Sequence, residues 1–287
     1  MPDRCALQMQ RPLLHVLRLD RARIAPVHIF EQLRLEEALY RADGNNWIVV
    51  NDGGHAPPHP SVVLGISGKP EKMCDVTRIQ QEDVPLYRRF TGGGTVVVGE
   101  GTTFISLIAN KSVLPSKNTN GPRELMKWSG DWYSNALREC GVDVGSEESS
   151  KHAFALREND YVLGNRKFAG NAQGLSRDRF VHHTSILWSF QQLDMMLLQN
   201  PEKQPDYRAR RDHNEFLIPL SETMEDREAL PNALIRQLAK MGFDLVDVDP
   251  DDAMVKEALV RKHHKSSSAV TVLNEKIDSH SVVKKRW

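Results

Sequence analysis

The chain has 287 residues, of which 40% are hydrophobic, enough to bury the core of one substantial domain with a smaller appendage. Its 38 basic residues balance its 38 acidic ones, which excludes a strong overall attraction to nucleic acid or to an anionic membrane. The three cysteines, Cys5, Cys74 and Cys140, are odd in number and lack the spacing of metal ligands, so they predict reduced thiols and no metal site.

The N-terminus and the apolar runs indicate the cellular compartment of the protein. No apolar run is long enough to cross a bilayer, and the N-terminus lacks the apolar core of a secretory signal. The first 23 residues do carry five arginines against two aspartates. We therefore expect an intracellular protein, cytoplasmic or mitochondrial, that has neither nucleic acid nor a membrane as a partner.

The first half of the chain predicts one helix among several strands. Strand patterns lie over residues 13–20, 46–52, 61–67, 84–90, 94–98 and 102–110, and an amphipathic helix pattern over 28–43 is stopped by Gly44. Turn-rich residues separate the second and third strands. The strands between 84 and 110 are expected to form a meander.

The second half predicts a further helix and further strands. A helix with an apolar side covers residues 123–141 and ends at Gly141, strands cover 152–173 with a bend at Gly164 and Asn165, and another strand covers 180–190. After about Pro219 the chain is charged and prone to form helix. We expect a main domain over residues 12–220 and a small charged helical accessory region or tail over 221–287.

Three consecutive glycines stand in the stretch RRFTGGGTVVV, from Arg88 to Val98. Glycines weaken a strand, so such a run marks either a structural bulge or a place where another group approaches the backbone closely. Exposed N–H groups beside Arg88 and Arg89 would suit an anion such as phosphate. The pattern is neither a Walker loop nor a dinucleotide fingerprint, since no GK[ST] follows and a strand, not a helix, comes next.

Two more motifs follow the glycines. In GNRKFAGNAQ, Lys167 lies just after the predicted turn and beside small residues, which leave room for a ligand that its ammonium would stabilise. In VHHTSIL, His182 and His183 point to opposite faces of a strand, so at most one of them should face a pocket. A solvated lysine and core or surface histidines remain the structural alternatives.

Taken together and in this order, the motifs resemble those of the lipoate-protein ligase A family, the lipoate ligase and octanoyltransferase group of the biotin/lipoate-protein ligase superfamily. That family carries RR-x-SGGG, then GRK-SG-SA, then HHGTLL, where this chain reads RRFTGGGTVVV, GNRKFAGNAQ and HHTSIL. The resemblance covers roughly residues 45 to 220, and it implies that the domain over 12–220 is a catalytic domain like that of lipoate and biotin ligases. It implies an α/β (α+β) fold with a mixed, largely antiparallel sheet flanked by helices.

The resemblance also implies site residues and ligands. It gives Lys167 the central catalytic role, in contact with the acyl carbonyl and the α-phosphate of ATP, and Mg²⁺ would help to neutralise the pyrophosphate. It implies lipoate or octanoate as substrate, and lipoyl domains of 2-oxoacid dehydrogenase complexes or the glycine-cleavage H protein as acceptors. Nucleotide contacts fall on Arg89, Gly92, Gly93, Gly94, Thr95, Val96, Val97 and Asp160, and substrate contacts on Arg88, Thr91, Leu64, Asn159, Gly170, Asn171, Ala172, His183 and Thr184.

Departures from the family motifs keep three functions open. Asn171 replaces a small hydroxyl residue, Thr184 replaces the glycine of HHGT, and GISGKP stands where lipoate ligases often carry GRNQ. An ATP-dependent ligase is favoured, because no cysteine precedes the lysine motif as in one transferase branch. A transferase acting through a cysteine thioester without ATP, and a lipoyl-binding module without turnover, are the alternatives. Biotin ligation is weaker, because the loop GRGRRG is absent.

Overall fold

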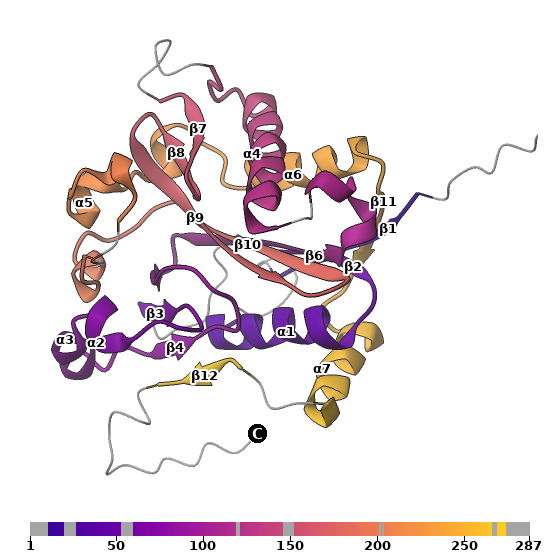
Figure 1. The fold of residues 1–287 in the computed structure, drawn as a ribbon, viewed down its shortest axis with the longest axis horizontal. Helices are drawn as coiled ribbons and strands as arrows, with labels where there is room; N and C mark the ends of the chain where they lie inside the picture. Colours follow the sequence, from indigo (N-terminus) through magenta and orange to yellow (C-terminus); the bar gives the residue numbers. More distant parts are fainter. Residues whose placement is uncertain are drawn as a thin grey trace, which may run out of the picture.

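The computed structural model describes residues 11–19, 27–52, 60–118, 121–145, 152–200, 202, 204–265 and 269–273. The described residues form two sheets, and the larger has the strand order β11-β1-β2-β6-β10-β9-β8-β7 (Figure 1). Both neighbours of β1 run parallel to it, and the other pairings are antiparallel. The bounds are β1 Leu13–Arg18, β2 Asn46–Asn51, β6 Thr102–Asn110, β7 Phe154–Arg157, β8 Asp160–Leu163, β9 Arg166–Leu175, β10 Arg179–Leu187 and β11 Asp244–Val248.

The smaller sheet has the order β12-β4-β3-β5, formed by β3 (Ser61–Leu64), β4 (Leu86–Arg88), β5 (Val96–Val98) and β12 (Thr271–Val272). Strands β4 and β5 lie on opposite edges of β3, and β6 belongs to the larger sheet, so the predicted meander over 84–110 is wrong. The glycine stretch instead connects the two edges of β3. Gly65 permits this crossing, because a Cβ there would lie 2.3 Å from the carbonyl oxygen of Gly93.

Helices cover both faces of the larger sheet (Figure 1). On one face lie α4 (Pro122–Glu139) and α6 (Ala229–Lys240), and on the other lie α1 (Ile29–Ala42), α7 (Ala253–Lys265) and the smaller sheet. Helix α1 begins where the His28 side chain accepts a hydrogen bond from the Phe30 N–H, at 3.2 Å. Side chains of β6 alternate between the two faces of the sheet. Ile105 and Leu107 belong to the core under α4, and Phe104 and Ile108 belong to the core beside α1.

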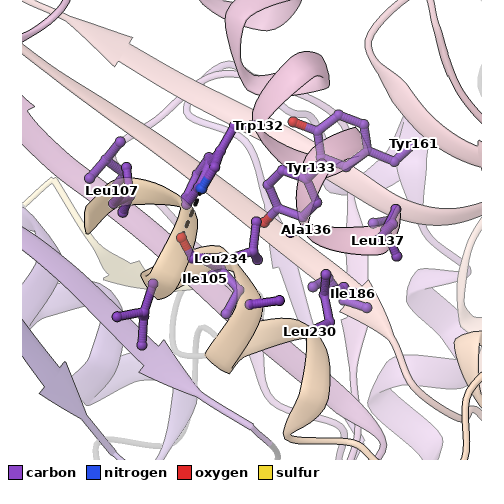
Figure 2. Packing of buried hydrophobic residues seen from close by; sticks show 14 of the residues in the cluster. Ile105, Leu107, Trp132, Tyr133, Ala136, Leu137, Tyr161, Ile186, Leu230 and Leu234 are labelled. Atoms are coloured by element: carbon purple, nitrogen blue, oxygen red, sulfur yellow. Dashed lines mark hydrogen bonds between the residues drawn. The ribbon is translucent and has the colours of Figure 1, made fainter. Parts of the chain in front are cut away.

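Trp132 fixes the packing of α4 against α6 (Figure 2). Its ring is fully buried, and its Nε1 donates to the carbonyl oxygen of Leu234 at 3.0 Å. Large residues on both helices and on the sheet belong to the same core, and Figure 2 shows Leu107 and Leu234 beside the ring. This contact joins a helix from the expected accessory region to the core of the larger sheet.

The residues after 220 are thus integrated into the fold. Besides α6, they supply β11, which extends the larger sheet beside β1, and β12, which pairs with β4. The described residues after 220 therefore pair with and pack against the rest of the fold. Sequence periodicity did not reveal these contacts, because both strands are short and their partners lie far away in the chain.

Short helical segments complete the fold: α2 Pro70–Met73, α3 Val76–Gln81, α5 His213–Phe216, and the 3-10 turns η1 Lys111–Val113, η2 Ser116–Asn118, η3 Asp194–Leu197, η4 Asp206–Arg208 and η5 Leu220–Glu222. A search of the described helices finds none with the length and apolar character needed to cross a membrane. The basic N-terminal segment and Cys5 lie mostly or wholly outside the described residues.

Candidate active site

A cavity of about 650 Å³ lies between the larger sheet and the smaller one. All three sequence motifs reach it, although they are up to 96 residues apart in the sequence from Arg88 to Thr184. The predicted residues that line it are Arg89, Gly92, Gly93, Gly94, Thr95, Val96, Val97, Asn159, Asp160, Lys167, Gly170, Asn171, Ala172 and His183. The sequence therefore located the cavity, although geometry alone assigns no ligand to these residues.

The floor of the cavity consists of two rows of side chains across the larger sheet. Pairing of β6, β10 and β9 aligns Ser106, His183 and Ala172 in one row, of which His183 and Ala172 line the cavity. The neighbouring row aligns Ser185 with Gly170, and continues onto β8 at Asp160. Because Gly170, Ala172 and Ser185 have small side chains or none, they leave room for a ligand above the sheet.

A β-bulge turns Lys167 toward this floor. Tyr161 pairs with Ala169 and Val162 pairs with Lys167, which leaves Phe168 as an extra residue in β9. Phe168 and Ala169 are both buried in the core under α4, while Lys167 and Gly170 line the cavity. In an unbroken strand, Lys167 and Gly170 would point to opposite faces. The bulge thus explains how the lysine and the glycine share one face.

The ammonium of Lys167 is held by a carboxylate from β8. Lys167 Nζ lies 2.8 Å from Asp160 Oδ1, and both side chains are partly exposed to the cavity. The other oxygen, Asp160 Oδ2, accepts a hydrogen bond of 2.8 Å from the Tyr207 hydroxyl. Burial is the first cause that raises the pKa of Tyr207, followed by the charge of Asp160, so the phenol remains a donor. Asp160 therefore orients Lys167 over Gly170.

The glycine stretch is stabilised from within by Arg89. Arg89 is 4% exposed, and its Nη2 donates to the carbonyl oxygens of Gly92 (2.7 Å) and Gly94 (2.8 Å). Its Nε donates to Thr91 Oγ1 at 3.1 Å. Burial lowers the pKa of this guanidinium to about 10, and the charge of Glu36 opposes that shift. In this structure Arg89 fixes the loop that lines the cavity, a role that the sequence did not predict.

Four predicted substrate residues do not line the cavity. Arg88 Nη1 donates to the carbonyl oxygens of Gly65, Ile66 and Gly68, so it fastens the turn after β3. Leu64 is fully buried in the core of the smaller sheet, and Thr91 is buried as an acceptor for Arg89. Thr184 lies on the opposite face of β10, where its hydroxyl donates to Asn171 Oδ1 at 2.8 Å. The alternation of the strand explains why Thr184 and His183 face opposite sides of the sheet.

The segment from Gln199 to Leu217 forms part of the cavity wall and was not predicted. Its lining residues are Gln199, Gln204, Pro205, Arg208, His213, Phe216 and Leu217. Gln204 Oε1 is a buried acceptor without a partner among the described residues. Burial is the first cause that lowers the pKa of His213 to about 4, followed by the positive charges of Arg208 and Lys167. This polar segment lacks periodicity, so the sequence gave no signal of its position.

The two described cysteines do not line the cavity, although Cys74 adjoins its lining residues Met73 and Leu198. Cys74 is fully buried at the end of α2, and Cys140 is half-buried at the end of α4. Burial raises the pKa of the Cys74 thiol to about 12 and also raises that of Cys140. Neither thiol is therefore activated as a nucleophile at neutral pH.

Among the residues that the structure describes, no three His, Cys, Asp or Glu side chains are grouped so as to hold a metal ion. Magnesium that enters with a nucleotide needs only one or two carboxylates in addition to phosphate oxygens and water. Glu158 and Asp160 both line the cavity, so the residues present fit such an ion. This ion would neutralise charge on the phosphates.

Comparison with known proteins connects this site to a family. A family model described as "Lipoyl protein ligase A/B catalytic domain" matches residues 28–240. A Plasmodium falciparum protein named "Inactive lipoate--protein ligase 2" is 30% identical over 264 residues, which is 76% of this chain and 67% of that protein.

Solved structures share the fold. A bi-partite lipoate protein ligase from Thermoplasma acidophilum, described with its E2 lipoyl domain, matches with a TM-score of 0.66 and 17% identity over 90% of this chain and 93% of that one. A lipoate-protein ligase A bound with ATP matches with a TM-score of 0.65 and 18% identity over 90% and 96%. The expected mixed, largely antiparallel sheet flanked by helices is confirmed. With three motifs around one cavity and a family model over most of its length, the chain belongs to the lipoyl protein ligase A/B catalytic domain family.

Proposed function

We propose that this protein is an ATP-dependent lipoate-protein ligase, which activates lipoate or octanoate as an acyl-AMP and transfers the acyl group to a lysine of a lipoyl domain. The observation that carries this proposal is the position of Lys167. The bulge in β9 brings its ammonium close to Gly170 and to 2.8 Å from Asp160, in the cavity that the glycine stretch also lines.

This arrangement suits the first chemical step. The attack of a carboxylate on the α-phosphate of ATP gathers negative charge, which an ammonium and backbone N–H groups stabilise. Lys167 would supply the ammonium, and the Gly92–Gly94 stretch would supply the backbone donors. A magnesium ion, held at Asp160 or Glu158, would neutralise the pyrophosphate as it leaves. Val96 and Leu33 supply apolar wall for an aliphatic chain.

The cysteine-based transferase is the less favoured function. It requires an activated thiolate that reaches the acyl group. Cys74 and Cys140 are absent from the cavity wall, and burial raises the pKa of both thiols. This supports activation by ATP.

The relative named inactive makes turnover the main question. Arg89, Gly93 and Lys167 are all present in this chain and line one cavity, which supports an active enzyme. For the acceptor, the archaeal relative described with its E2 lipoyl domain supports a lipoyl domain. The domains of 2-oxoacid dehydrogenase complexes and the glycine-cleavage H protein are the candidates.

The test is release of pyrophosphate from ATP with lipoate, octanoate or biotin supplied separately, in the presence of magnesium. We expect release with lipoate or octanoate and accumulation of the acyl-AMP when no acceptor is present. Acyl transfer from a carrier protein without ATP, lost in a Cys74→Ser or Cys140→Ser variant, would establish the transferase instead. Binding of lipoate without either reaction would leave a binding module.

A further inference from the structure

A buried acid and an imidazole meet beneath the floor of the cavity. Glu36, on α1, is fully buried, and its Oε2 lies 2.7 Å from His183 Nδ1. Its other oxygen accepts a 2.8 Å hydrogen bond from Gln32 Nε2. Ser106 Oγ lies 2.8 Å from the same His183 nitrogen, and the Phe104 ring packs against the imidazole with centroids 4.8 Å apart. These contacts fix the orientation of the His183 ring.

The contact with Glu36 determines which nitrogen of His183 can serve the cavity. When Glu36 is ionised, its carboxylate only accepts hydrogen bonds, and Nδ1 then carries the proton that lies between His183 and Glu36. In the neutral ring, Nε2 then has a lone pair. Because Nδ1 is directed to α1 and His183 lines the cavity, Nε2 is the nitrogen that remains for a ligand. A carboxylate behind Nδ1 also stabilises the imidazolium that forms when Nε2 takes a proton.

The other candidate bases on the described cavity wall are less suitable. Asp160 is engaged by both Lys167 and Tyr207. Glu158 accepts a hydrogen bond of 2.8 Å from the backbone N–H of Asp206. His213 has its pKa lowered to about 4, mainly by burial, which makes it a weak proton acceptor at neutral pH.

Transfer to a lysine needs such a base. A free lysine has a pKa of about 10.4, so it arrives as an ammonium and cannot attack a carbonyl until it loses a proton. We infer that His183 Nε2 takes this proton from the acceptor lysine, and that Glu36 is the positioning residue that holds His183 in the required tautomer. This inference rests on the proposed function, and it concerns the transfer step rather than the formation of acyl-AMP.

The acceptor nitrogen loses two protons during the transfer. The ammonium gives its first proton to Nε2, and the neutral amine then forms the C–N bond with the acyl carbon. The C–O bond to the phosphate breaks, AMP leaves with the bonding electron pair, and the second amine proton passes to solvent. The imidazolium afterwards returns its proton to solvent.

The charged groups around the two residues are consistent with this role. On the loop after β4, the negative charge of Glu36 raises the pKa of the buried guanidinium of Arg89, against the larger lowering that burial causes. On β10 itself, His182 points to the opposite face, where burial first and His183 second lower its pKa to about 3, so it stays neutral. Ser106 on β6 is uncharged. Among the described residues, Glu36 is therefore the acidic side chain in contact with the ring of His183.

The experiment supplies chemically prepared lipoyl-AMP to the full-length protein, so that it does not depend on activation by ATP. Transfer is measured at pH 7 to a lipoyl domain and, separately, to hydroxylamine, an amine that is already neutral and needs no base. The variants are His183→Asn and Glu36→Gln. The matched control is Glu31→Gln, which changes an exposed glutamate of the same helix. Long-range ¹H–¹⁵N NMR spectra report the tautomer of His183.

We expect His183→Asn to slow transfer to the lysine about 100-fold, the scale of general base catalysis, while transfer to hydroxylamine stays near the wild-type rate. Glu36→Gln should slow lysine transfer less, change the Nδ1–H signal of His183, and recover as the pH rises and free amine accumulates. Equal losses with both nucleophiles, or no loss with lysine, would overturn the inference. Failure of the wild type to form acyl-AMP from ATP would overturn only the proposed activation step.

Discussion

Gly93 is the most constrained position of the glycine stretch. Its φ is +99°, and a Cβ added there would lie 2.8 Å from Arg89 Nη2. A residue with a side chain costs about 1–2 kcal/mol in a left-handed backbone conformation. Displacing Nη2 weakens its bonds to the Gly92 and Gly94 carbonyls, which adds about 1–2 kcal/mol for a charged donor. We expect Gly93→Ala to lower the free energy of unfolding by about 2–4 kcal/mol, and the Tm by roughly 3–7 °C for a chain of 287 residues.

Urea denaturation of Gly93→Ala and Gly94→Ala, side by side, measures this effect. An added Cβ at Gly94 meets nothing within 4 Å, so Gly94→Ala should change stability by less than about 0.5 kcal/mol. Its methyl group enters open space on the cavity wall and should still weaken the binding of ATP. Equal stability of the two variants would refute the role given to the Arg89 contacts.

Three further predictions concern Gly170, the two described cysteines and Glu139. A Cβ in Gly170→Ala would lie 3.0 Å from Lys167 Nζ, so the ammonium must move, and adenylation should fall about 100-fold with a near-normal melt; unchanged kinetics would contradict this. Cys74→Ser and Cys140→Ser should retain acyl transfer, and Cys74, with its pKa raised to about 12, should resist alkylation at pH 8 until the protein unfolds. The pKa of Glu139 is lowered to about 2, first by the bond from the last lysine of α6, so its stabilising effect is present above about pH 4.5 and lost as the pH falls toward 2. Glu139→Gln should flatten the pH dependence of the urea midpoint in that window, and an unaltered slope would count against the ion pair.

Periodicity predicted the elements of the fold better than their pairing. The strands at Asn46–Asn51 and Thr102–Asn110 and the helix Pro122–Glu139 all follow clear apolar patterns in the sequence. The crossing from β4 to β5 over the end of β3 depends on contacts between distant backbones, above all the approach of Gly93 to Gly65. No local pattern contains that information, so the sequence suggested a simple meander.

For the site, too, the sequence indicated residues within one local motif but not contacts between segments distant in the chain. The sequence located Lys167 and Asp160, because their motif lies in one hairpin. It did not identify Glu36, since a buried glutamate on α1 resembles the exposed Glu31 of the same helix until the sheet is in place. Nor did it show that the Arg89 guanidinium donates its hydrogen bonds to its own loop. The carbonyl oxygens that it binds become neighbours only when that loop folds.

Single-turnover formation of acyl-AMP tests the central claim most directly. ATP, magnesium and lipoate are mixed with excess protein without an acceptor, and the wild type is compared with Lys167→Met and with Lys127→Met, which changes an exposed lysine of α4. We expect the wild type and Lys127→Met to form lipoyl-AMP at similar rates, and Lys167→Met to lose at least about 100-fold while its thermal melt stays close to that of the wild type. Formation of lipoyl-AMP at the wild-type rate by a folded Lys167→Met protein would contradict the role of Lys167.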